Sequence, residues 1–112
     1  MNRTLIVFCL TLSCSIAAIA EDNRMAIVGV GTHSCGMYLD YRSKKNETME
    51  MLYEQWGAGF LAGHASGAKR MNNPVADLPT ITAYIDKYCA DNPLSNVVSA
   101  VNRLRGKLGS YR

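Results

Sequence analysis

The first 20 residues constrain this fold most, because they are expected to be removed from the chain that folds. Arg3 gives a positive start, residues 4–16 form an apolar stretch, and Ala18-Ile19-Ala20 places small residues where a signal peptidase reads them. We predict an export signal over residues 1–20, with cleavage between Ala20 and Glu21, which would place the protein in a bacterial periplasm or outside the cell. A membrane anchor is not expected, since about 13 apolar residues fall short of the ~20 that span a bilayer.

Removing this leader changes the composition on which the fold is judged. The full chain has 112 residues, of which 48% are apolar, with four cysteines and a net charge of +3. Without residues 1–20 it has 92 residues, 40 of them apolar, two cysteines and a net charge of +2. This composition excludes a multidomain, collagen-like, disordered or multi-spanning membrane protein. It also argues against a large enzyme with a deep cofactor cleft, because so small a chain buries only about 60 to 65% of its unfolded surface.

The two remaining cysteines, Cys35 and Cys89, lie 54 positions apart. An even pair in a small exported domain most simply predicts a disulfide. Closing a loop of this length stabilises a protein by about 4 kcal/mol in the chain-entropy model, which is comparable with the whole net stability of a small core. The alternative is a reactive thiol with His33 as its base, although no CxxC motif supports redox catalysis.

Apolar residues three and four positions apart predict helices joined by short connections. Four segments carry this pattern, running from Thr32 or Ser34 to about Ser43, from Asn46 or Thr48 to about Ala68, from Asp77 to about Cys89, and from Asn92 to about Leu108. In the third segment Asp77 is the expected N-cap, with Pro79 in the first turn. In the fourth, Asn92 is the expected N-cap and Pro93 the first helical residue, with Leu94 beginning the apolar stripe.

A Gly-rich run from Met25 to Gly31 precedes these helices and carries too much glycine for a strand. We predict a flexible, extended arm over residues 21–33 and a single helical domain over residues 34–112. The expected fold class is therefore all-α: a small four-helix bundle with one disulfide and an extended N-terminal arm.

The longest predicted helix carries aromatic residues and a run of glycines in register. Its predicted apolar face holds Met49, Leu52, Tyr53, Trp56, Phe60 and Gly63. Gly59, Gly63 and Gly67 follow one another at intervals of four, and each internal glycine costs about 1 kcal/mol relative to alanine. The expected gain is the close approach of another helix, either the third or fourth helix of the same chain or a second subunit. The candidate surface for clients or for a dimer comprises Trp56, Gly59, Phe60, Gly63 and Gly67.

No catalytic constellation is predicted, since the chain contains no paired carboxylates, Ser-His-Asp order or HExxH segment. His33 and His64 do not make a metal site by themselves, and adding Cys35 matches no zinc spacing. The five methionines after the leader are scattered, which is typical of core filling and not of copper binding. The basic C-terminal residues are expected to form a solvated helix end, and export removes nucleic acid as a partner. We expect no enzymatic activity, cofactor, metal or membrane-integral segment after cleavage.

Three short motifs carry a resemblance to a known family. They are Cys35-Gly36-x-Tyr38-Leu39-x-x-x-Arg42, Trp56-Gly57-Ala58-Gly59-Phe60-Leu61-Ala62-Gly63, and Tyr88-Cys89-Ala90-Asp91-Asn92-Pro93. From about Ser34 to Leu108 the chain resembles the HdeA/HdeB family of periplasmic acid-stress chaperones. The resemblance implies a small helical bundle in which Cys35 and Cys89 form the single disulfide. It also implies a dimer at neutral pH that dissociates on acidification and exposes apolar surface to unfolded clients.

The middle motif is also similar to the Rap/Tai immunity proteins, which are helical periplasmic antidotes to cell-wall amidases of type VI secretion. That resemblance implies binding and inhibition of an amidase toxin. A third alternative is an exported helical module with an unknown protein partner. Acid chemistry is compatible with the chaperone alternative, because protonating nine carboxylates and two histidines would raise the formal charge of the chain without its leader from +2 to +13.

Overall fold

The computed structural model describes residues 26–67 and 76–110, and these residues form helices connected by turns. In chain order the elements are η1 (Gly29–Thr32), α1 (Cys35–Ser43), α2 (Glu47–Gly67), α3 (Leu78–Asp91) and α4 (Val97–Ser110). Within the two described ranges there is no strand, and the only extended pairing is an isolated bridge between Ser34 and Asn96. The predicted all-α fold with four helices is confirmed.

Three of the four helices begin where the sequence predicts, because a polar side chain caps each one. The cap accepts a hydrogen bond from the backbone N–H three residues later, at 3.1 Å for Ser34, 3.1 Å for Asn46 and 2.9 Å for Asp77. Hydrogen bonds from the Thr80 hydroxyl and N–H also lower the pKa of Asp77. These short-range signals fix the starts of α1, α2 and α3.

The predicted start of the fourth helix is wrong. Asn92 closes α3 instead, where its N–H donates to the Tyr88 carbonyl at 2.8 Å. The helix α4 begins at Val97, and its cap is Asn96, whose side-chain oxygen accepts from Ser99 at 2.9 Å. Pro93 and Leu94 lie in the turn between α3 and α4, where Leu94 is fully exposed at 102%.

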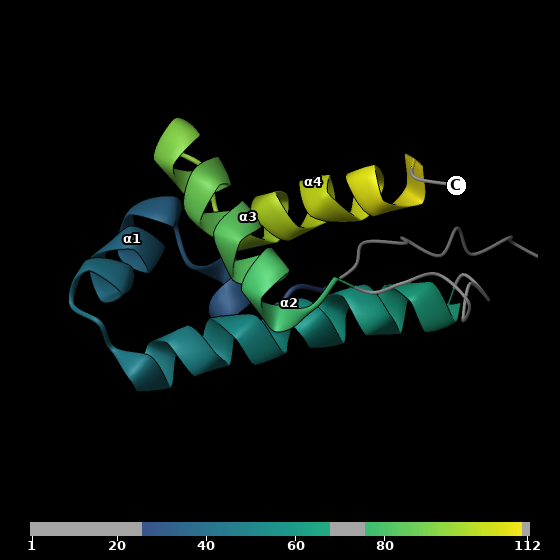
Figure 1. The fold of residues 1–112 in the computed structure, drawn as a ribbon, viewed down its shortest axis with the longest axis horizontal. Helices are drawn as coiled ribbons and strands as arrows, with labels where there is room; N and C mark the ends of the chain where they lie inside the picture. The colour runs from purple at the N-terminus through teal and green to yellow at the C-terminus, as the bar shows by residue number, and fades with distance from the viewer. Residues whose placement is uncertain (1–25, 68–75, 111–112) are drawn as a thin grey trace, which may run out of the picture.

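The core is built from one face of each helix, with α3 in contact with the other three helices. In Figure 1, α2 runs along one side of the molecule and α3 crosses it. The buried apolar side chains come from all four helices and are Cys35, Tyr38, Tyr53, Leu61, Ile81, Ile85, Cys89, Val97, Ala100, Val101 and Leu104. The Cys35–Cys89 disulfide, which joins α1 to α3 within this cluster, confirms the predicted pairing.

Helix α2 buries a stripe that shares only Tyr53 with the predicted one. Its fully buried positions are Tyr53, Gly57 and Leu61, which follow one another at intervals of four. Leu52, which was expected on the buried face, is 46% exposed. Trp56 is only half-buried at the edge of the core. Of the three predicted aromatic residues, Tyr53 is therefore at the centre of the buried face, whereas Trp56 and Phe60 lie beside it.

The predicted extended arm also needs a correction. Residues 26–28 lack helical structure and Val28 is extended, but Gly29–Thr32 forms the 3₁₀ turn η1, which contacts α2 and α4. Figure 1 shows this purple-blue segment against the middle of α2. Gly29 has φ of +78°, a left-handed conformation that glycine adopts without strain, and so it starts the turn. The predicted leader, the Ala20/Glu21 cleavage site and residues 21–25 of the arm lie outside the described residues.

Candidate functional site

Two aromatic side chains stand next to each other along α2. Trp56 and Phe60 are one helical turn apart and stack with 5.1 Å between ring centroids and 23° between ring planes. Both rings are half-buried and pack against the outside of the core. The pair therefore packs against the core and remains partly exposed.

The segment before α1 lies directly on Trp56. We call residues 28–32 the strap. The indole Nε1–H of Trp56 donates to the Val28 carbonyl at 2.9 Å, and Gly31 is buried beneath the indole ring. A Cβ placed on Gly31 would overlap the six-membered part of that ring, so only glycine fits this contact. Trp56 thus lies between the strap and the core.

The glycines of α2 fall into two groups that the sequence did not separate. Gly57 is buried, and a Cβ on it would lie 3.0 Å from Ile81 Cγ2. Gly59, Gly63 and Gly67 are exposed, and within the described ranges a Cβ on any of them would meet no heavy atom within 4 Å. The expectation that their register serves packing against the third or fourth helix is therefore wrong for the described elements, because helix rotation turns them away from the Gly57 side.

We call Trp56, Gly59, Phe60, Gly63 and Gly67 together the α2 face. A hollow of about 340 Å³ lies on it, between residues 26–28 and the side chains of Gln55, Trp56 and Phe60. Val28, at the rim of the hollow, is 73% exposed. The α2 face itself carries no charged residue. The structure therefore brings the five predicted surface residues onto one apolar, uncharged strip of helix.

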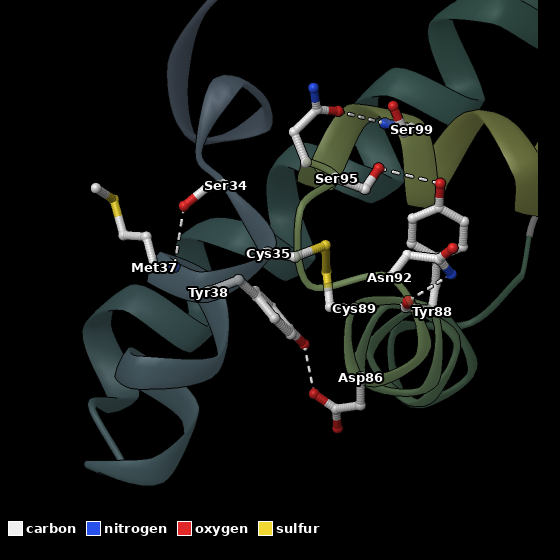
Figure 2. The surroundings of a disulfide bond; sticks show 11 residues. Ser34, Cys35, Met37, Tyr38, Asp86, Tyr88, Cys89, Asn92, Ser95 and Ser99 are labelled. Atoms are coloured by element: carbon white, nitrogen blue, oxygen red, sulfur yellow. Dashed lines mark hydrogen bonds between the residues drawn. A yellow bond between two sulfur atoms is a disulfide. The ribbon is translucent and has the colours of Figure 1, made fainter.

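A charged cluster ties α1, α2 and α3 together away from this face. Arg42 donates to both carboxylate oxygens of Asp86, at 2.9 and 2.8 Å, and forms an ion pair with Glu50 at 3.0 Å. The Tyr38 hydroxyl donates to the same Asp86 carboxylate at 2.7 Å, as Figure 2 shows. Hydrogen bonding to Asp86 raises the pKa of Arg42, and burial raises the pKa of Tyr38 well above its usual range.

A second polar contact joins the strap region to the core. His33 Nδ1 lies 2.8 Å from the hydroxyl oxygen of Tyr53, whose ring packs edge-on against Tyr38. Burial raises the pKa of Tyr53 to about 12. His33 and Cys35 do not form the thiol and base pair considered from the sequence, because the Cys35 sulfur is in the disulfide.

The junction around the disulfide fixes the end of the strap. Cys35 N–H donates to the Ser95 carbonyl at 2.9 Å, and Val97 N–H donates to the His33 carbonyl at 3.0 Å. Figure 2 shows the Cys35–Cys89 bond beside the turn that contains Asn92 and Ser95. The chain is therefore pinned immediately after the strap, at the start of α1.

Among the described residues, no group of three or more His, Cys, Asp or Glu side chains is placed to hold a metal ion. In the same residues, no helix has the length and apolar character needed to cross a bilayer. His64 lies at the exposed end of α2, beside Arg105 of α4 at 3.2 Å.

Sequence reasoning missed the two strap glycines and the Arg42–Asp86 pair. Gly29 and Gly31 were interpreted as reasons against a strand, whereas they allow the strap to approach the single tryptophan of the chain. The Gly-x-Gly spacing in an apolar run was the available signal, but the aromatic partner lies 25 residues beyond Gly31. The Arg42–Asp86 pair is separated by 44 residues and has no local signal.

Comparisons with protein-family models, with curated proteins and with solved structures each return no match. The function therefore has to be argued from the α2 face and the strap.

Proposed function

We propose that this protein is an exported, non-enzymatic helical chaperone that binds unfolded polypeptides through the α2 face. The proposed setting is the periplasm and the proposed role is acid stress, as in the HdeA/HdeB family that the sequence resembles. One observation carries the proposal: a stacked Trp56–Phe60 pair is accessible beside three glycines that have open space around them.

The energetics of α2 support a binding role for this face. Each glycine inside a helix costs about 1 kcal/mol relative to alanine, and a Cβ on either internal glycine, Gly59 or Gly63, would contact no other described atom within 4 Å. A smooth helix surface without Cβ atoms lets another backbone approach closely. Aromatic residues dominate the energetics of protein interfaces, and Trp56 and Phe60 lie beside that smooth surface.

The charged cluster supports acid sensitivity. Arg42 is held by two carboxylates, from Asp86 of α3 and Glu50 of α2, and Tyr38 donates to Asp86 as well. Ion pairs between arginine and carboxylates are in general lost in strong acid, and the arginine charge is then unbalanced. The accompanying rise in positive charge opposes association of two copies, so a neutral-pH homodimer formed through the α2 face would separate.

The test is light scattering after size exclusion at neutral pH and at about pH 3, below the ordinary carboxylate range, with a client aggregation assay at both pH values. Wild-type protein is expected to dissociate in acid and to suppress aggregation. Phe60→Ala should weaken suppression, because it removes half of the stacked pair. Leu94→Ala is the matched control, since it removes a fully exposed apolar side chain from the turn between α3 and α4.

Client aggregation that proceeds unchanged with wild-type protein present would contradict the chaperone proposal. Suppression lost equally in Phe60→Ala and Leu94→Ala would contradict the assignment to the α2 face. If suppression is absent and the protein instead binds a cell-wall amidase with nanomolar affinity, the immunity alternative replaces the chaperone.

A further inference from the structure

The strap is an apolar peptide that already occupies part of the α2 face. Its first four residues are Val28, Gly29, Val30 and Gly31. The Val28 carbonyl accepts from Trp56, and Gly31 lies under the indole ring. The strap therefore shows which polypeptide chemistry this face accepts: small and β-branched apolar residues, a glycine under the indole, and a backbone carbonyl facing Nε1.

The strap is held mainly by packing, since Val30 lies against the core and Gly31 is buried, and among the described residues its one hydrogen bond to α2 is that from Trp56 to Val28. Its bonds from His33 N–H to Val30 and from the Thr32 hydroxyl to Gly29 are local to the segment. The following residues are pinned separately, by the Cys35 bond to Ser95 and by the disulfide. A short segment held by packing and one hydrogen bond opens at a lower free-energy cost than the helices that form the centre of the core.

Space for a ligand continues beyond the strap. The hollow of about 340 Å³ runs from residues 26–28 to Gly59 and Phe60, where no charged side chain lines it. Gly59 has nothing within 4 Å of a Cβ position in the described residues, and Gly63 follows one turn later with the same openness. An extended chain lying over Trp56 can therefore continue along α2.

We propose that the α2 face binds an extended apolar polypeptide segment in place of the strap, so that the strap is an internal competitor that limits binding. The inference rests on the proposed function and adds to it both the chemistry of the bound segment and a built-in control of affinity. When only the strap-free fraction of molecules can bind, the apparent affinity is reduced by that fraction.

The test uses Gly31→Ala in the disulfide-bonded protein and a fluorescein-labelled synthetic peptide with the sequence of residues 26–32, AIVGVGT. The added Cβ removes the strap from the indole, while the peptide keeps its own glycine and still fits. Trp56 is the single tryptophan, so its emission should shift to longer wavelength when the strap leaves. Peptide affinity measured by anisotropy should rise about tenfold, the factor that corresponds to losing one net hydrogen bond and its packing.

Two variants accompany this measurement. Gly106→Ala in α4 is the matched control, because a Cβ there meets nothing within 4 Å among the described residues, and its peptide affinity should equal that of wild type. Gly29→Ala perturbs the strap through its backbone, since φ of +78° strains any residue with a Cβ. Gly29→Ala should increase peptide affinity by a smaller factor than Gly31→Ala. It replaces Gly31→Ala in the test if circular dichroism shows that Gly31→Ala does not fold.

The outcomes separate this inference from the proposed function. Unchanged emission and unchanged peptide affinity in both strap variants would overturn the inference, as would a shifted emission without tighter binding. If wild-type protein protects clients and no strap variant improves this protection, the chaperone proposal stands and the competition by the strap is refuted. If Gly31→Ala binds the peptide more tightly but no form of the protein protects clients, the competition by the strap is supported and the chaperone proposal is refuted.

Discussion

Replacing single glycines of α2 by alanine tests whether the α2 face is open in solution. Gly63→Ala places a Cβ where no described atom lies within 4 Å, so the variant gains only helix propensity. This gain is about 1 kcal/mol in the free energy of unfolding. For a domain of this size it corresponds to a rise of about 4 to 8 °C in Tm.

Gly57→Ala is the matched contrast on the same helix. Its Cβ would lie 3.0 Å from Ile81 Cγ2 and 3.8 Å from Val101 Cγ2, and both of these side chains are fully buried. Overpacking of a close-packed core costs about 1 to 3 kcal/mol, which outweighs the propensity gain of about 1 kcal/mol. We expect Gly57→Ala to be less stable than wild type and about 2 kcal/mol less stable than Gly63→Ala.

The assay is urea unfolding followed by circular dichroism, repeated at several protein concentrations. Gly106→Ala on α4 provides a second open glycine and should gain as much stability as Gly63→Ala. Destabilisation of Gly63→Ala to the level of Gly57→Ala at every protein concentration would refute the reasoning, because it would mean that the same chain covers the α2 face. A loss that appears only at high concentration would instead identify the proposed homodimer as the cover, and the gain in stability would return on dilution.

Three further predictions concern the core and its pH dependence. Reduction of the Cys35–Cys89 bond, which closes a separation of 54 residues, should lower the free energy of unfolding by about 4 kcal/mol in urea titrations with and without reductant. Asp86→Asn should destabilise by about 1 to 2 kcal/mol after allowance for solvent screening of the partly exposed Arg42 pair, and high salt should shrink the difference from wild type. The folded-state pKa of Tyr53 is raised to about 12, so its contribution to the free energy of unfolding is complete below the unfolded value near 10 and is lost as pH rises through 12. Absorbance at 295 nm and circular dichroism should therefore change together in this range. Tyr53→Phe should reduce the loss of stability at alkaline pH.

Local chemistry explains which parts of the fold were predictable. Ser34, Asn46 and Asp77 cap their helices through bonds three residues long, so each signal is contained in a few letters of sequence. The predicted start of the fourth helix was wrong because both Asn92 and Asn96 can serve as N-caps. The observed start at Val97 coincides with the bonds from Cys35 to Ser95 and from Val97 to His33, which are contacts across 60 or more residues that no local pattern contains.

The candidate site also combines features that local sequence predicts with features that depend on distant contacts. Trp56 and Phe60 were predictable as neighbours, since four residues make one helical turn. Which side of α2 faces the core was not, because alanine and glycine surround the aromatics and give the apolar stripe no sharp edge. Gly57 and Gly59 look alike in the sequence, yet Ile81 lies against the first and open space surrounds the second. That distinction depends on where α3 crosses α2.

The length of α2 relative to the core is the strongest argument for an external partner. The last fully buried residue of the helix is Leu61, yet the helix continues for six more residues to Gly67. In that extension His64 lies 3.2 Å from Arg105 of α4, and its side chain is exposed. Isolated helical turns are marginal in water, and glycine makes them worse. A helix that extends past its own core on such residues gains stability when another chain packs along it, and the neighbouring Trp56–Phe60 pair supplies the apolar area for that contact.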